Sequence, residues 1–179
     1  MFMEKIKSEG LAHLSYVIGS EGEAAVIDPR LDPETYREAG RARGWRITHV
    51  FETHRNEDLV SGAAALSRGT GAPVHHGPNA AGDVPYADTV GDGRTFDVGS
   101  VTLRVLETPG HTDDSISLVV HDDDAQGQPV AVFTGDALFA GDVGRTDFYP
   151  ERAREVARAL YDSLMGKLLP LGDGCVVYP

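Results

Sequence analysis

The chain has 179 residues, of which 41% are hydrophobic and 25% are charged, a composition typical of one globular domain with its own core. Its net charge of -12, from 28 acidic and 16 basic residues, repels nucleic-acid phosphates and anionic lipids, so we expect neither nucleic acid nor a membrane as partner. The N-terminal residues lack the apolar core of a secretory signal, and no apolar run approaches the ~18 residues of a membrane span, so we expect a cytoplasmic protein.

The first half of the chain alternates predicted strands and helices. Two β-rich runs at residues 14–18 and 24–28 flank a Gly-Ser-Glu-Gly turn, which predicts a hairpin. Asp32 as N-cap and Pro33 at the first helical position predict a helix that ends near Gly44. The pattern continues with a strand and then an Ala-rich helix, over residues 46–51 and 59–67.

The second half of the chain is mainly β-structure with one long helix. Runs bounded by Gly, Pro or Asp predict short strands over residues 73–75, 101–108, 115–121, 130–133 and 175–178. Before the last strand, residues 151–169 carry apolar side chains at steps of three and four, which predicts one helix with a buried stripe of Ala153, Val156, Ala157, Leu160, Leu164 and Leu168. No linker divides the chain, so we predict a single α/β domain over residues 1–179.

Three polar clusters directly follow predicted strands and contain His54, His111 and Asp136. The single cysteine, Cys175, excludes cysteine-rich zinc sites, so a metal site must use histidines and carboxylates. Two imidazoles and one carboxylate suit first-row metals and leave coordination positions open for a substrate. The same residues could equally be loop caps or hydrogen-bonded turn residues.

Here the sequence resembles a known family. ETHRNEDLVSG is similar to the THxHxDH signature of metallo-β-lactamase-fold hydrolases, ETPGHTDDSIS to their TPGHTxGS turn, and FTGDALFAGDVGRTDF to their TGDxLFxxxxGRxDF loop. The motifs occur in family order, and the resemblance extends over almost the whole chain. Within the family it is greatest to persulfide dioxygenases, particularly bacterial forms joined to rhodanese domains. It implies an αββα sandwich in which two mixed sheets pack face to face with helices outside.

The chain departs from the family pattern at the ligands for a second metal. Asn56 and Leu59 stand where the first motif has its second and last histidines, and the sequence ends before the family's final histidine, so we expect a C-terminal portion to be lacking. The persulfide dioxygenase pattern is retained, because its single iron uses the positions of His54, His111 and Asp136. The resemblance thus implies one Fe(II) per chain, with Zn(II) as the alternative.

Two further residues receive roles from the resemblance. Asp58 would orient His54 or a metal-bound water from the outer shell, although it could equally cap a helix that begins at Leu59. Arg145 matches an arginine beside the iron site, where a guanidinium could hold a carboxylate or persulfide group. Its alternative is a structural ion pair with Asp147 or Asp142.

Three functions follow as hypotheses. The first is an iron dioxygenase that uses O2 to oxidise a small thiol persulfide, such as glutathione persulfide, to sulfite. The second is a thioester hydrolase of the glyoxalase II type, and the third is a catalytically degenerate module that serves an attached sulfurtransferase. A fused or separate rhodanese domain and a homodimer are the protein partners that the resemblance leaves open. The remaining histidines, His13, His49, His75, His76 and His121, are assigned to packing or to the surface.

Overall fold

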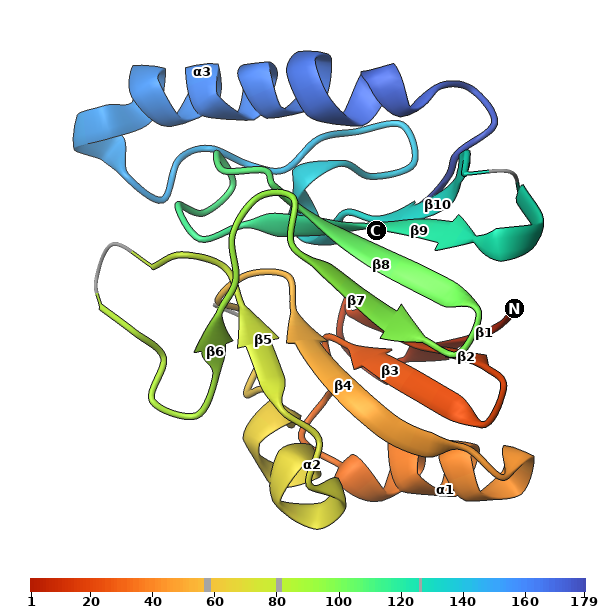
Figure 1. Cartoon of the computed structure of the whole chain (residues 1–179). Coiled ribbons are helices and arrows are strands. Elements are labelled where there is room, and N and C mark those ends of the chain that lie inside the picture. The colour runs from red at the N-terminus through yellow and green to blue at the C-terminus, as the bar shows by residue number, and fades with distance from the viewer. Residues whose placement is uncertain (57–58, 80–81, 126) are drawn as a thin grey trace.

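The computed structural model describes residues 1–56, 59–79, 82–125 and 127–179. Two β-sheets lie face to face in the middle of the domain, and helices cover both outer faces (Figure 1). The alternation of strands and helices in the first half of the sequence therefore builds one sheet with its helices, and the later strands build the other. This is the αββα arrangement that the family resemblance implies.

The first sheet is formed by the N-terminal half of the chain. Its strands, in spatial order, are β1 (Phe2–Lys7), β2 (Leu14–Ser20), β3 (Glu23–Ile27), β4 (Arg46–Glu52), β5 (Val74–His76) and β6 (Asp88–Thr89). The first three strands are antiparallel neighbours, and the pairs from β3 to β6 are parallel. The outer face of this sheet is covered by α1 (Pro33–Arg43) and α2 (Ala63–Thr70) (Figure 1).

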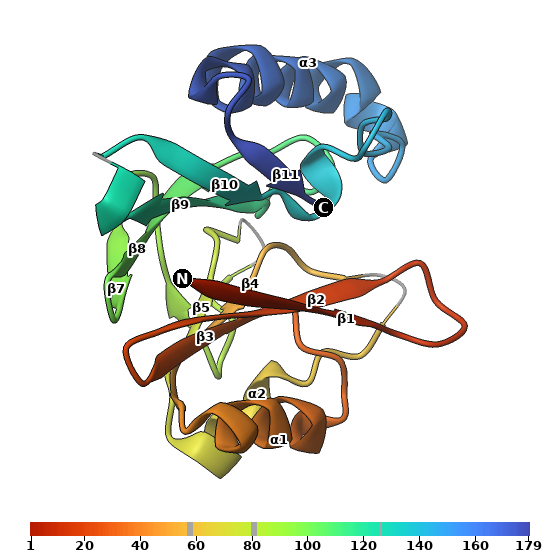
Figure 2. The same cartoon turned by 90° about the vertical axis from the view of Figure 1, so that its right-hand side faces the viewer.

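The second sheet is formed by the C-terminal half. Its spatial order is β11 (Val176–Tyr178), β10 (Pro129–Phe133), β9 (Ile116–Asp122), β8 (Val101–Glu107) and β7 (Thr95–Val98). All neighbours are antiparallel except β10 and β11. Helix α3 (Ala153–Ser163) lies across the outer face of this sheet, as Figure 2 shows from the side.

Three apolar layers hold the sandwich together. The largest lies between the sheets and includes Phe51, Leu118 and Phe133, which are almost fully buried. A second layer packs the first sheet against α1 and α2, and a third packs the second sheet against α3 around Leu160. Each buried side chain of this size stabilises the fold by about 1.5–3 kcal/mol. The strand ends that carry polar loops are therefore fixed by a rigid core.

Most predicted elements are confirmed within two residues. Helix α1 has Asp32 as its N-cap, whose carboxylate accepts a hydrogen bond from the Glu34 amide at 3.2 Å, and it ends at Gly44 in the left-handed conformation. The sequence analysis did not predict strands β1, β6 and β7. Strand β1 is an edge strand with mainly exposed or half-exposed side chains, and β6 has only two residues, so neither carries a clear apolar alternation.

The prediction of the second helix was wrong at its start. Helix α2 begins at Ala63 instead of Leu59, because the preceding residues run along the chain segment that follows β3. Ser61 forms an isolated β-bridge with Arg30, and the Gly62 amide donates to the Pro29 carbonyl at 2.7 Å. These contacts fix an extended backbone, which excludes an earlier helical turn.

The alternative role of Asp58 as N-cap of this helix is consequently wrong. The Ser61 hydroxyl accepts a hydrogen bond from the Ala63 amide at 3.1 Å and takes the place of the expected cap. Asp58 itself lies outside the described residues, so its expected role beside His54 stays a prediction.

The long C-terminal helix is interrupted. It consists of a 3₁₀ turn at Pro150–Arg152, the α-helical segment α3, a π-helical turn at Leu164–Leu168 and a final 3₁₀ turn at Leu169–Leu171. In the predicted stripe, Val156, Leu160 and Leu168 are buried, whereas Ala153 and Ala157 are exposed, which corrects the prediction. The two alanines lie on the solvent side because the buried face of α3 continues through Ser163 instead.

In the part of the chain that the structure describes, no helix is long and apolar enough to cross a membrane.

Candidate metal centre

Three loops at strand ends bring His54, His111 and Asp136 together. His54 follows β4, His111 lies in the turn between β8 and β9, and Asp136 follows β10. One ligand atom from each residue lies within 4.8 Å of the others. The nearest Asp136 carboxylate oxygen is 4.0 Å from Nε2 of His54 and 3.4 Å from Nε2 of His111. The three residues that the sequence singled out therefore share one site.

Backbone contacts fix the loops relative to one another. The Ile116 amide at the start of β9 donates to the Thr53 carbonyl at 2.7 Å, which ties the His111 turn to the His54 loop. Gly135 has φ +48°, and a Cβ there would lie 2.3 Å from Oγ1 of Thr53. Glycine is required because any side chain would push the Asp136 loop away from His54.

The hydrogen bonds of both imidazoles direct the same nitrogen toward the centre. Nδ1 of His111 lies 3.1 Å from the Arg145 carbonyl, which can only accept, so Nδ1 carries the proton. Nδ1 of His54 lies 2.8 Å from Oγ1 of Thr53. In the neutral form of both rings these partners favour the tautomer in which Nε2 carries the free lone pair, which is the state a metal-ligating imidazole needs.

Asp28 completes the support of His54. Its carboxylate accepts hydrogen bonds from the Thr53 amide at 2.7 Å and from the Thr53 hydroxyl at 2.8 Å. Because that hydroxyl donates its hydrogen to Asp28, its oxygen can accept a hydrogen bond from the Nδ1–H group of His54. Burial raises the pKa of the Asp28 carboxyl to about 7. The hydrogen bonds from Thr53 lower this pKa, and the nearby charges of Glu52 and Asp136 raise it.

The sequence analysis did not assign roles to Asp28 and Thr53. Asp28 ends the run AVID at a sharp turn and has φ +50°, which is unusual for a residue other than glycine. An aspartate directly after an apolar strand was the only signal in the sequence, because its strained conformation is visible only in the structure. Its partner lies 25 residues away, and only the pairing of β3 with β4 brings the two together.

The electrostatics of the centre suit a divalent cation. His54 and His111 are buried, whereas the Asp136 side chain is 43% exposed and opens the site on one side. Burial lowers the pKa of His54, an effect that the carboxylate of Asp136 partly offsets, so its imidazole is neutral at pH 7. Two imidazoles and one carboxylate that converge on one point fit a single first-row metal ion.

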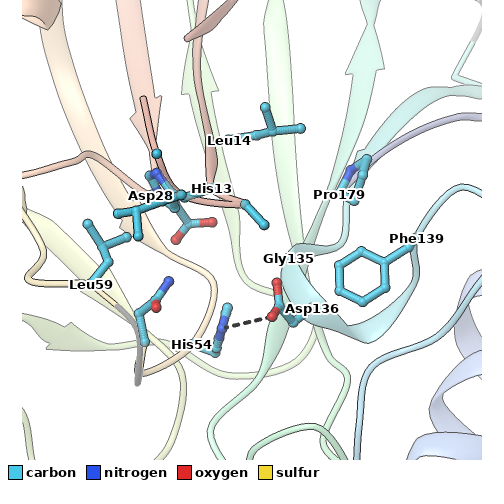
Figure 3. Close-up of a pocket in the computed structure, with 13 residues that line it drawn as sticks. His13, Leu14, Asp28, His54, Leu59, Gly135, Asp136, Phe139 and Pro179 are labelled. Carbon is cyan, nitrogen blue, oxygen red and sulfur yellow. Dashed lines mark ion pairs between the residues drawn. The ribbon is translucent and has the colours of Figure 1, made fainter. Parts of the chain in front are cut away.

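A cavity of about 350 Å³ opens beside this centre. Figure 3 shows the carboxylate of Asp136 facing the His54 ring across it. The remaining labelled wall residues are His13, Leu14, Asp28, Leu59, Gly135, Phe139 and Pro179. Asn56 and Leu59, which replace histidines of the family signature, both line this cavity next to His54. Among the described residues, this is the one place where three or more His, Cys, Asp or Glu side chains bring their ligand atoms together.

Arg145 does not line the walls of the cavity as far as the structure describes them. Its guanidinium forms a bidentate ion pair with Asp147, in which Nε and Nη2 donate to the two carboxylate oxygens at 2.6 and 2.8 Å. The guanidinium also lies over the Phe148 ring. That ring packs edge-on against His111 at 5.1 Å between centroids. The structure thus shows the structural ion pair that the sequence left open as the alternative role of Arg145.

Comparison with known proteins identifies the family. The model of the metallo-beta-lactamase superfamily matches residues 9–178. The chain belongs to this superfamily. The hydroxyacylglutathione hydrolase of Polaromonas sp. is 37% identical, over all of this chain and 66% of that protein. The counterpart from Methylococcus capsulatus is also 37% identical, over 78% of this chain and 52% of its own length. The chain thus spans about half to two thirds of the length of these curated relatives.

Solved structures of superfamily members agree with the fold. A metallo-beta-lactamase from Staphylococcus aureus superimposes with a TM-score of 0.90 at 31% identity, over all of this chain and 55% of the other. ETHE1 from Myxococcus xanthus superimposes with a TM-score of 0.84 at 34% identity, over all of this chain and 75% of the other. The predicted fold and superfamily are thereby confirmed.

The link from Asp28 through Thr53 to His54 generates a first prediction. We expect Thr53→Val to weaken metal binding by about 10- to 100-fold, because the proton of Nδ1 loses its acceptor and the ring loses its orientation. Competition with a chromophoric chelator measures the metal dissociation constant. Thr53→Ser keeps the hydroxyl and should bind metal as the unmodified protein does. Equal affinities in Thr53→Val and the unmodified protein would contradict the proposed link.

Proposed function

We propose that this domain is a mononuclear non-haem iron dioxygenase that oxidises a small thiol persulfide. The reaction consumes the persulfide, O2 and water and yields the free thiol, sulfite and two protons. The observation that carries this proposal is the set of two imidazoles and one carboxylate without ligands for a second metal among the described residues. A site of this kind is typical of Fe(II) oxygenases, in which open positions accept both substrate and O2.

The residues beside the cluster support one metal over two. The amide of Asn56 is a much weaker metal donor than imidazole, and Leu59 has no donor atom. Both side chains line the cavity next to His54, where the ligands of a second ion would be needed. A dinuclear hydrolytic site is therefore disfavoured by the chemistry of the wall itself.

The protein's own residues hold and orient the reactants. When bound, Fe(II) supplies the redox chemistry that moves electrons from the outer persulfide sulfur to O2, whereas Zn(II) could only polarise a bond or activate water. His54, His111 and Asp136 would hold the ion, and Asp28 and Thr53 keep His54 in the ligating tautomer. Leu14, Leu59 and Phe139 give the cavity an apolar wall, which limits the access of water to the reacting sulfur.

The similarity to ETHE1 supports this proposal, because its identity of 34% extends over the whole chain and the motifs of the sequence most resemble those of persulfide dioxygenases. The curated relatives favour a second candidate, since they are named hydroxyacylglutathione hydrolases at up to 37% identity. A thioester hydrolase would use the same cavity but needs a metal that activates water. We place it second because Asn56 and Leu59 do not supply the ligands of a dinuclear site.

The proposal predicts the metal content and the reaction. Purified without oxygen or chelator, the protein should contain about one iron per chain and consume O2 when a thiol persulfide is added, with sulfite as product. Elemental analysis and an oxygen electrode on the same preparation provide the test. Two zinc ions with release of thiol from a hydroxyacylglutathione would favour the hydrolase. A metal-free, inactive protein would favour the degenerate module.

Two histidine variants provide the control. His111→Ala removes one of three ligands and should lose the iron. His75→Ala also removes a buried histidine, but His75 packs against His49 and Phe96 away from the cluster and should leave the iron in place. Full iron occupancy in His111→Ala would contradict the ligand assignment.

A further prediction separates a substrate role of Arg145 from its ion pair. If the guanidinium exchanges Asp147 for an anionic group of the substrate, Arg145→Ala should keep its iron but lower kcat/KM by about 10- to 100-fold. Asp147→Asn breaks the same ion pair and leaves the guanidinium available, so it should retain kcat/KM. Both side chains of the pair are solvent-exposed, so it contributes little to stability and neither variant should melt much earlier. Normal kinetics in Arg145→Ala would remove it from the site.

A further inference from the structure

A second cavity meets the first at the metal centre. It has a volume of about 220 Å³ and shares the walls formed by His54, Asp28 and Asn56 with the larger cavity. Its other side is formed by Glu52 at the end of β4 and by Tyr86 from the segment before β6. A substrate with its sulfur at the cluster can therefore extend into this cavity.

Glu52 is a buried carboxylate with little hydrogen bonding. Its side chain lines the cavity, although the residue is only 5% exposed. The Tyr86 hydroxyl lies 3.2 Å from each of its two oxygens, but one hydroxyl hydrogen can serve only one of them at a time. An ionised carboxylate can accept about four hydrogen bonds. Across the described residues, no Lys, Arg or His forms an ion pair with it.

The acidic residues at this cavity are Glu52 and Asp28. The raised pKa of Asp28 leaves it only partly ionised at pH 7, so Glu52 is the principal acidic group of the wall. Asp114 lies 3.6 Å from Nε2 of His76, which is also a wall residue. Arg55 is also a wall residue, and its guanidinium donates to the Tyr149 hydroxyl at 2.8 Å and lies over that ring. A carboxylate of a ligand would meet like charge at Glu52, whereas an ammonium group would meet a desolvated acceptor.

We infer that the 220 Å³ cavity binds the thiol carrier and that Glu52, held by Tyr86, accepts hydrogen bonds from an ammonium group of that carrier. This inference rests on the proposed function and specifies its substrate class as persulfides of small amine-bearing thiols. An ammonium group supplies three donors and can satisfy the carboxylate oxygen that the Tyr86 hydroxyl leaves free. The volume lies below the ~300–1,000 Å³ of sites for drug-sized ligands, which suits a small carrier.

Two isosteric thiols provide the test. Cysteamine and propane-1-thiol differ only in an ammonium group against a methyl group. The iron-loaded protein should oxidise cysteamine persulfide with a kcat/KM about 10- to 100-fold above that for propane-1-thiol persulfide, as expected for one charged hydrogen bond. Glu52→Gln should reduce this ratio by a similar factor and keep the iron. Glu23→Gln makes the same charge change at the start of β3 and should keep the ratio.

Binding without turnover separates this inference from the proposed function. Calorimetric titration of the metal-loaded protein, without O2, should show tighter binding of cysteamine than of propane-1-thiol, and the difference should disappear in Glu52→Gln. Tyr86→Phe leaves the carboxylate in place and should retain most of the preference. Selective binding without any O2 uptake would refute the dioxygenase and leave the subsite standing. Equal binding of the two thiols, or an equal loss for both in Glu52→Gln, would overturn the subsite.

Discussion

Thr53 connects the parts on which the metal centre depends. Its carbonyl accepts the Ile116 amide of the other sheet, so it ties two ligand loops together across the sandwich. Its hydroxyl lies between the Asp28 carboxylate and Nδ1 of His54, and its side chain leaves room only for glycine at position 135. The relative positions of all three candidate ligands thus follow from contacts of one residue that is itself no ligand. Such supporting contacts are what keep a metal site preorganised.

The sequence predicts the ligands because each follows a strand end in a short, recognisable run. His54, His111 and Asp136 lie in Thr-His, Pro-Gly-His and Thr-Gly-Asp segments, and the resemblance to the persulfide dioxygenase pattern implies that they share one site. The supporting residues are harder to predict, because Asp28 and Thr53 meet only through the parallel pairing of β3 and β4. The start of α2 was missed for the same reason, since the contact of Ser61 with Arg30 is made across the fold.

The two cavities resolve a difficulty raised by the composition. A chain with a net charge of -12 is poorly suited to attract a substrate with several negative charges. The wall of the smaller cavity continues this bias through the buried carboxylate of Glu52. An amine-bearing thiol carries a positive charge that matches this wall. Electrostatics and cavity size therefore point to the same kind of carrier, and the apolar wall of the larger cavity suits the sulfur.

The central claim is that one metal ion is held by His54, His111 and Asp136. Anomalous diffraction from crystals of the anaerobically purified protein, recorded on both sides of the iron edge and of the zinc edge, tests it most directly. We expect one iron peak that lies within bonding distance of Nε2 of both histidines and of the Asp136 carboxylate. Two metal peaks, with the second beside Asn56 and Leu59, or a single peak away from this triad, would contradict it.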